Sequence, residues 1–144
     1  MRVHIVIPAR FASSRLPGKP LAPIGGRPMV VRVAERAAAT IADDVTVAVD
    51  DPRVQQAVQA AGFDAVMTNV NHSSGSDRTM EVARINAWPD EDVVVNVQGD
   101  EPLIPISVID RLIASMRVSQ ALQMATVAEP LDTLSLIHIS EPTR

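Results

Sequence analysis

The chain has 144 residues, of which 47% are hydrophobic and 21% charged, a composition typical of one globular domain rather than a disordered segment. It contains no cysteine, which excludes disulfides and thiolate metal sites and fits a reducing, cytoplasmic compartment. The net charge of −4 combines a basic first 36 residues, with seven Lys or Arg against one acid, and an acidic remainder. We therefore expect a local anion-binding site in the first part of the sequence.

Composition also argues against two classes of partner. The chain has two Phe, one Trp and no Tyr, too few aromatic residues for a base-stacking platform, so no nucleic-acid partner is expected. No run approaches the roughly 20 apolar residues that a membrane-spanning helix needs, so no membrane association is expected.

Short β-branched runs alternate with amphipathic runs of helix length. We predict strands over residues 3–7, 45–49, 64–68, 93–97 and 124–128, and helices over residues 28–40, 52–61, 76–87 and 107–117. Pro28 is expected at the first position of its helix. Strands that are apolar throughout are buried on both faces, which predicts an α/β fold with a mainly parallel sheet.

Each predicted helix has apolar positions that we expect to face the core. In the first helix these are Met29, Val30, Val33, Ala34 and Ala37; in the helix over 76–87, Met80, Val82, Ala83 and Ile85; in the last, Ile109, Leu112, Ile113 and Met116. Ligands of such sheets bind beyond the carboxyl ends of the strands. The loops after Ile7, Met67 and Val97 should therefore meet at one site.

The last eleven residues, 134–144, read LSLIHISEPTR. This string back-translates onto a common transposon-library sequencing adapter, so we expect the domain to occupy residues 1–133 and residues 134–144 to be a non-native tail. His138 is accordingly not considered as a ligand. The reading frame in the source genome tests this, because finding LSLIHISEPTR encoded there would contradict it.

The loop at residues 8–21 follows the first predicted strand and carries three cations, Arg10, Arg15 and Lys19. Its small residues allow close backbone approach to a phosphate chain, and Pro17-Gly18 supplies a turn that directs Lys19 back into the loop. The loop is neither a Walker motif nor a dinucleotide fingerprint, because the required glycines are missing. Anion binding is favoured over the alternative of a solvated basic loop.

Two more segments have chemistry at the same edge. The strand over 93–97 leads to Gln98, Gly99 and Asp100, where glycine permits a close approach or an unusual backbone angle. Asp100 is a candidate Mg²⁺ ligand, the alternative being a cap on the turn before the next proline. Residues 72–78 are expected at the start of a helix, where serine hydroxyls and backbone N–H groups can bind an anion. The alternative, which is the more common one, is that such a segment only caps the helix.

Together, the three segments resemble the CMP-Kdo synthetases, or 3-deoxy-manno-octulosonate cytidylyltransferases. The family pattern I-P-A-R-x-x-S-[ST]-R-x-P-x-K-x-L matches residues 7–21, H-x-S-G-[ST]-[DE]-R matches residues 72–78, and V-N-V-Q-G-D-E-P matches residues 95–102. CMP-sialic acid synthetases share the fold and chemistry but have a different first loop. Methylerythritol cytidylyltransferases carry a glycine-rich loop that is absent here.

The resemblance implies a Rossmann-like three-layer α/β/α nucleotidyltransferase fold with a mainly parallel sheet, truncated because family members are longer. It implies transfer of CMP from CTP to 3-deoxy-manno-octulosonate (Kdo), with Mg²⁺ as cofactor, in cytoplasmic lipopolysaccharide biosynthesis. The full-length parent would be a homodimer. Its second half supplies much of the sugar-acid site, so this chain alone is expected to have little activity.

Carried onto matching positions, the resemblance assigns roles to individual residues. The catalytic residues would be Arg15, Lys19 and Asp100, and Asp100 would hold the metal. The nucleotide-binding residues would be Ala9, Arg10, Arg15, Lys19, Ser74, Gly75, Arg78 and Gln98. Two alternatives stay open: a related nucleotidyltransferase for another sugar acid such as sialic acid, and a non-catalytic module that binds a nucleotide without turnover.

Overall fold

The computed structural model describes residues 1–13, 15–119 and 125. Along the chain, its elements are β1 (Val3–Ala9), the 3-10 helix η1 (Lys19–Leu21), β2 (Pro23–Ile24), β3 (Arg27–Pro28), α1 (Met29–Ala38), β4 (Asp44–Val49), α2 (Pro52–Ala60), β5 (Asp64–Met67), α3 (Gly75–Ile85), β6 (Val93–Asn96) and α4 (Ile106–Val118). The first four predicted strands and all four predicted helices are confirmed. The strand predicted over 124–128 and the tail at 134–144 lie outside the described residues.

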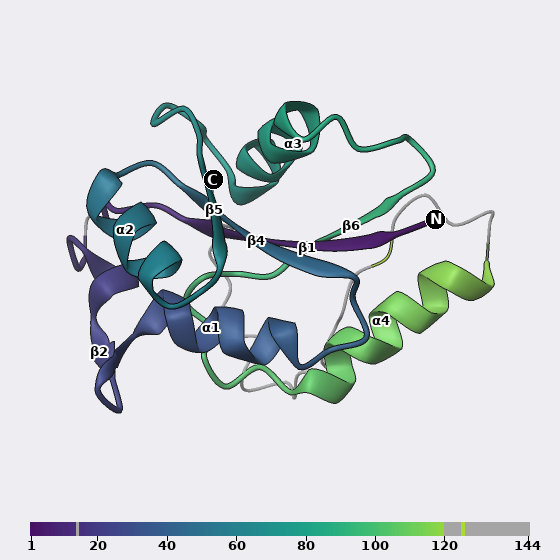
Figure 1. The fold of residues 1–144 in the computed structure, drawn as a ribbon, viewed down its shortest axis with the longest axis horizontal. Coiled ribbons are helices and arrows are strands. Elements are labelled where there is room, and N and C mark those ends of the chain that lie inside the picture. The colour runs from purple at the N-terminus through teal and green to yellow at the C-terminus, as the bar shows by residue number, and fades with distance from the viewer. Residues whose placement is uncertain (14, 120–124, 126–144) are drawn as a thin grey trace, which may run out of the picture.

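The main sheet has four strands in the order β5-β4-β1-β6, and every neighbouring pair is parallel. β1 lies between β4 and β6 and is buried along nearly its whole length. Figure 1 shows α3 on one side of the sheet and α1, α2 and α4 on the other. This is the predicted three-layer α/β/α arrangement, and it brings all carboxyl ends of the strands to one edge.

Alternating residues of β1 serve two separate cores. Ile5 and Ile7 pack with α1, α2 and α4 in the larger core. Val6 packs with Ala48 of β4 and Val82 of α3 in the smaller one. Because successive side chains of a strand point to opposite faces, an uninterrupted apolar run is required for a strand covered on both sides.

α3 confirms only part of the predicted core face: Val82 is buried and Ala83 is partly buried. Met80 and Ile85 are 50% and 53% exposed, whereas Arg78, Thr79 and Val82 are buried. Residues two apart on a helix point about 200° apart, so Met80 and Val82 cannot both face the sheet. Ile85 is the last helical residue. A buried arginine thus occupies the face on which apolar side chains were predicted.

The other helices agree more closely with their predicted faces. The five core positions predicted in α1 are all buried. In α4, Ile109 and Ile113 are buried while Leu112 and Met116 are only partly covered. Within the described residues, no helix combines the length and apolar content needed to cross a membrane.

A small hairpin, β2 and β3, precedes α1 and was not predicted. Gly25 and Gly26 form its turn with φ of +58° and +83°, left-handed conformations that glycine adopts without a steric cost. Pro28 ends the hairpin and is the N-cap of α1 rather than its first helical residue.

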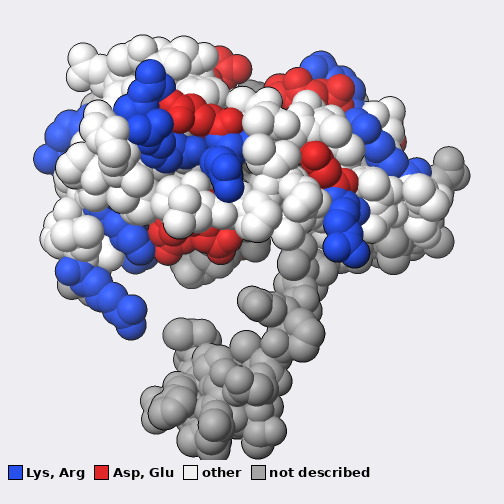
Figure 2. Space-filling view, turned by 90° about the horizontal axis from the view of Figure 1, so that it is seen from below, with Lys and Arg blue, Asp and Glu red and all other residues white. Residues whose placement is uncertain are grey.

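The face seen in Figure 2 carries basic and acidic side chains side by side rather than a continuous basic surface.

His4 is a buried polar residue in the middle layer, and only 1% of it is exposed. Its Nδ1 lies 2.9 Å from Asp44 Oδ1 and its Nε2 lies 2.9 Å from Asp92 Oδ2. The ring stacks on Trp88, with ring centroids 3.9 Å apart. Asp92 Oδ1 also accepts the Arg2 N–H, so these contacts join the start of β1 to the loop before β6.

The arrangement around His4 predicts a pH-dependent stability. The hydrogen bond from the Arg2 backbone N–H, with that from His4, lowers the pKa of Asp92 from its ordinary 3.8. A carboxyl with a depressed folded pKa contributes stability above its unfolded pKa and loses it as pH falls through the folded pKa. The thermal midpoint of the wild-type chain should therefore exceed that of Asp92→Asn by a constant, maximal amount above about pH 4. This difference should decrease as the pH is lowered towards about 2.

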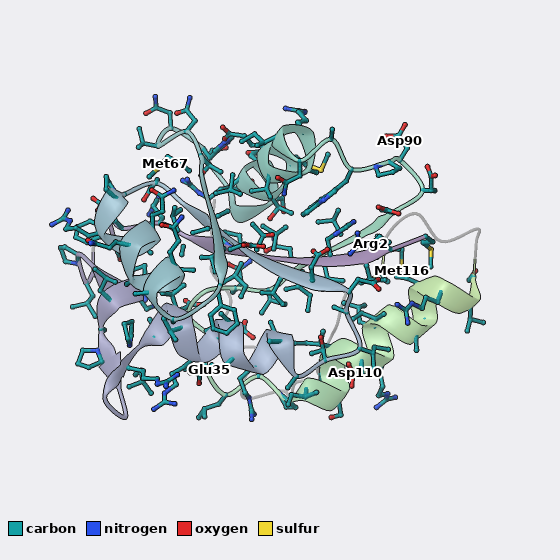
Figure 3. All side chains as sticks on the ribbon, in the orientation of Figure 1. Arg2, Glu35, Met67, Asp90, Asp110 and Met116 are labelled. Atoms are coloured by element: carbon teal, nitrogen blue, oxygen red, sulfur yellow. The ribbon has the colours of Figure 1, made fainter. Side chains whose placement is uncertain are left out.

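The matched control for this measurement is Asp90→Asn. Asp90 is exposed and points away from the sheet (Figure 3), so its substitution should leave the thermal midpoint nearly unchanged at every pH. A difference for Asp92→Asn that stays constant from pH 7 to pH 2 would contradict the assignment.

Candidate functional site

A cavity of about 340 Å³ lies at the carboxyl edge of the sheet. The loops after β1, β5 and β6 meet there, as the sequence predicted. Its lining residues are Pro8, Ala9, Arg10, Ser13, Lys19, Pro20, Met29, His72, Ser73, Ser74, Gly75, Arg78, Gln98, Gly99 and Asp100. Three Lys or Arg residues, a helix N-terminus and one carboxylate therefore share a single cavity.

The cationic loop is closed by hydrogen bonds of its own backbone. Gly18, with φ of +72°, donates its N–H to the Phe11 carbonyl over 2.9 Å. This closure brings Lys19 beside Arg10 on the cavity wall, which agrees with the turn predicted at Pro17-Gly18. Arg15 is exposed and is not among the residues that line the cavity.

The loop after β6 forms the opposite wall. Asp100 Oδ2 accepts from Lys19 Nζ over 3.1 Å, and both side chains are about half exposed. Within the described residues, no group of three or more His, Cys, Asp or Glu is placed to hold a metal ion. Among the described residues that line the cavity, Asp100 is the only carboxylate and thus the candidate metal ligand.

Gly99 explains how the loop after β6 approaches β1 so closely. A Cβ at this position would lie 2.7 Å from the Pro8 carbonyl oxygen, and Gly99 is not among the glycines with positive φ. Of the two reasons considered for this glycine, close approach is therefore the one the structure supports. Gly75 contacts the same proline from α3, where a Cβ would lie 3.3 Å from Pro8 Cγ.

The N-terminus of α3 is capped by Ser74, whose Oγ accepts the Asp77 N–H over 3.1 Å. Ser76, a second serine of the same segment, lies within the helix. The hydroxyls of Ser74 and Ser73 donate to Asp77 and lower the pKa of that carboxyl. The first turn of α3 thus points its partial positive charge at the cavity, a suitable position for an anion.

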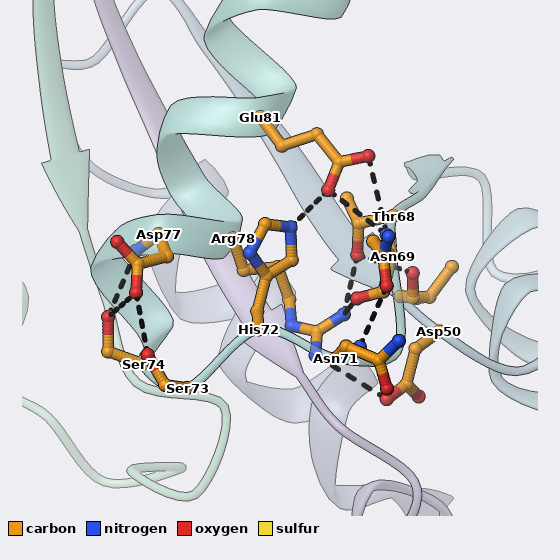
Figure 4. A network of polar contacts seen from close by, with 11 residues as sticks. Asp50, Thr68, Asn69, Asn71, His72, Ser73, Ser74, Asp77, Arg78 and Glu81 are labelled. Atoms are coloured by element: carbon orange, nitrogen blue, oxygen red, sulfur yellow. Dashed lines mark hydrogen bonds and ion pairs between the residues drawn. The ribbon is translucent and has the colours of Figure 1, made fainter.

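Arg78 lines the cavity, but its guanidinium group contacts other residues of the protein (Figure 4). Nη1 donates to Thr68 Oγ1 over 2.6 Å and to the Asn69 carbonyl over 3.1 Å. Nη2 lies 3.5 Å from Asp50 Oδ2. The family resemblance placed Arg78 beside the nucleotide; in the structure it is 2% exposed and joins α3 to the ends of β4 and β5.

Sequence reasoning gave little weight to two residues of this network. His72 lines the cavity, and its hydrogen bond to Glu81, with one from the Asn69 N–H, lowers the pKa of Glu81 from its ordinary 4.5. Asp50 was not singled out, although it directly follows β4. A carboxylate at the carboxyl end of a predicted strand was the signal that would have found it, as it found Asp100.

A parallel sheet with a cationic loop, a helix N-terminus and a carboxylate around one cavity is the arrangement of a nucleotidyltransferase. A nucleotidyl transferase from Methanothermobacter thermautotroptrophicus shares the fold, with a TM-score of 0.67 at 17% identity over 78% of this chain and 57% of that one. The chain belongs to the cytidylyltransferase family, because the family model described as Cytidylyltransferase matches residues 4–138.

Within that family, the chain is similar to 3-deoxy-manno-octulosonate cytidylyltransferases. It is 46% identical to 3-deoxy-manno-octulosonate cytidylyltransferase 2 from Burkholderia ambifaria, and the match covers 94% of this chain and 51% of the relative. The relative from Pectobacterium carotovorum is 52% identical over 92% of this chain and 53% of its own length. The chain thus spans about half the length of the curated relatives it matches.

A solved structure of CMP:2-keto-3-deoxy-manno-octonic acid synthetase complexed with CTP is 49% identical to this chain. The two superpose with a TM-score of 0.80 over 85% of this chain and 50% of that one. This similarity agrees with the resemblance found in the three sequence segments.

The close contact at Gly99 predicts a graded effect of substitution. Gly99→Ala should destabilise the chain by about 1–3 kcal/mol, because the new methyl group meets a backbone oxygen that cannot move freely. Gly75→Ala should cost less, because it meets a proline side chain and alanine favours the helix. Urea unfolding of both variants measures the difference, and a neutral Gly99→Ala would refute the close-approach explanation.

Proposed function

We propose that the protein containing this chain transfers CMP from CTP to Kdo, giving CMP-Kdo and pyrophosphate. The observation that carries the proposal is the cavity in which Arg10 and Lys19 lie with the N-terminus of α3. Cationic side chains and helix N-termini both bind phosphate groups. The similarity to a synthetase whose solved structure contains CTP supports the same substrate here.

The proposed reaction needs positioning and charge neutralisation more than covalent chemistry from the protein. A hydroxyl of the sugar acid attacks the α-phosphorus of CTP, and the bond from that phosphorus to the leaving pyrophosphate breaks. Arg10 and Lys19 would neutralise the pyrophosphate as its charge increases. Arg15, an exposed cation of the same loop, is assigned to this group by the family resemblance.

The remaining lining residues would hold the nucleoside part of CTP. Ser74 and Gly75 present hydroxyl and backbone donors at the start of α3, and Gln98 adds an amide from the loop after β6. Ala9 ends β1 beneath them. Arg78 would hold the first turn of α3 in place through its contacts with Thr68, Asn69 and Asp50.

The residues present fit one Mg²⁺ ion. In proteins Mg²⁺ usually takes one or two carboxylates and completes its shell with water and phosphate oxygens. Asp100 is the carboxylate that the described cavity offers and would hold the ion. When bound, the ion would supply neutralisation and polarisation of the phosphates.

The setting of this activity is part of the proposal. A cytoplasmic location, a role in lipopolysaccharide biosynthesis and a homodimeric full-length protein are all taken from the family resemblance. The sugar acid also follows from the names of the relatives, which are 3-deoxy-manno-octulosonate cytidylyltransferases. Sialic acid and a non-catalytic nucleotide-binding role remain testable alternatives that these names do not favour.

Asp100→Asn in the full-length protein should reduce kcat by about 100-fold or more, because the substitution removes the carboxylate that would hold the metal at the phosphates. Pyrophosphate release from CTP and Kdo measures the effect. The matched control is Glu101→Gln, the adjacent exposed carboxylate outside the cavity lining, which should retain most activity. Equal kinetics for the two variants would contradict the role of Asp100, and a wild-type protein that binds CTP without releasing pyrophosphate would favour the non-catalytic alternative.

A fragment of residues 1–133 should release pyrophosphate from CTP and Kdo far more slowly than the full-length protein. The reason is that, by the family resemblance, the second half supplies much of the sugar-acid site. Both proteins are compared in the same assay, with sialic acid in place of Kdo as the substrate control. A fragment with turnover typical of an enzyme would disprove this expectation.

A further inference from the structure

Asp50 joins the cationic loop to α3 through one buried carboxylate (Figure 4). It directly follows β4, and its Oδ1 accepts the Phe11 backbone N–H over 2.9 Å. Its Oδ2 lies 3.5 Å from Arg78 Nη2. The two side chains are only 6% and 3% exposed, so solvent hardly competes for either partner.

Phe11 is the residue through which Asp50 holds the whole loop. The peptide N–H of Phe11 is bound to Asp50, and its carbonyl accepts the Gly18 N–H over 2.9 Å. Arg10 and Lys19, the two cavity-lining cations of this loop, directly precede Phe11 and directly follow Gly18. Hydrogen bonds at both ends of Phe11 therefore constrain the backbone from which both cationic side chains extend.

Arg78 fixes the other wall in the same way. Its Nη1 is bound to Thr68 Oγ1 and to the Asn69 carbonyl, and Thr68 Oγ1 in turn donates to the Val49 carbonyl over 2.8 Å. The first turn of α3, which carries Ser74 and Gly75, is thereby tied to the ends of β4 and β5.

A buried ion pair is weak evidence for stability, because removing two charges from water offsets much of their attraction. The pair at Asp50 and Arg78 connects two walls of one cavity, and among the residues that the structure describes no other ion pair joins these two walls. We propose that Asp50 and Arg78 are positioning residues that set the distance between the cationic loop and the N-terminus of α3. Only the expected change in kinetics rests on the proposed function; the structural role of the pair does not.

The test compares Asp50→Asn with a closely matched control, Asp92→Asn, in the full-length protein. The Asp92 side chain is 7% exposed, accepts a backbone N–H beside β1, and lies 2.9 Å from Nε2 of the buried His4 ring. It differs in lying at the opposite end of β1, away from the cavity. Both variants should unfold at lower temperature than the wild type.

Hydrogen exchange of the nucleotide-free proteins is measured first. Asp50→Asn should increase the exchange of the Phe11 and Gly18 amides, while Asp92→Asn should leave both at the wild-type rate. Unchanged exchange in Asp50→Asn overturns the proposal. This measurement needs no nucleotide, so it decides the positioning role even if the protein proves not to use CTP, which would refute the proposed function alone.

Kinetics are measured second. Asp50→Asn should lower kcat/KM for CTP by about 10–100-fold through misplacement of the phosphate-binding cations, with the KM for Kdo nearly unchanged. Asp92→Asn should keep the wild-type kcat/KM for CTP. Equal losses in the two variants, in proportion to their thermal midpoints, would show a merely structural role and overturn the proposal.

Arg78→Lys provides a second variant if Asp50→Asn does not fold. It keeps a positive charge opposite Asp50 but loses the planar fork that contacts Thr68 and Asn69. An intermediate loss of kcat/KM for CTP supports the proposal, and a wild-type value contradicts it.

Discussion

The site depends on how closely two loops approach the carboxyl end of β1. Pro8 lies between Gly99 and Gly75, and a Cβ on either glycine would come within 3.3 Å of it. Because β1 is the inner strand between β4 and β6, this contact brings the loop after β6 and the start of α3 onto the same point. A larger side chain at either position would separate the walls of the cavity.

Charge in this cavity is arranged as two layers of different accessibility. The accessible layer contains Arg10, Lys19 and Asp100, which are exposed enough to exchange partners when a ligand binds. The buried layer contains Asp50 and Arg78, whose contacts are all with the protein. Exposed charges suit binding and buried ones suit positioning, since desolvated groups cannot change partners without a large cost.

Periodicity and motif spacing predicted the strands, the helices, the parallel sheet and the convergence of three loops. They failed for the buried face of α3 because an arginine there is covered by partners distant in sequence, including Asp50 and Thr68. The hairpin at Gly25 and Gly26 was also missed, although a Gly-Gly pair is a recognised turn signal.

By itself, the sequence determined the class of fold and the chemistry of the site. Uninterrupted apolar strands require a sheet covered on both faces, and the cations of residues 8–21 predict a phosphate site with Asp100 as its candidate metal ligand. Only the tertiary structure decided how each charged group meets the cavity: Arg15 is outside its lining, and Arg78 is in the lining but is buried and paired with Asp50. The physical reason is that a charge's role depends on its burial and on its partners, and chain folding alone brings residues 28 positions apart into contact.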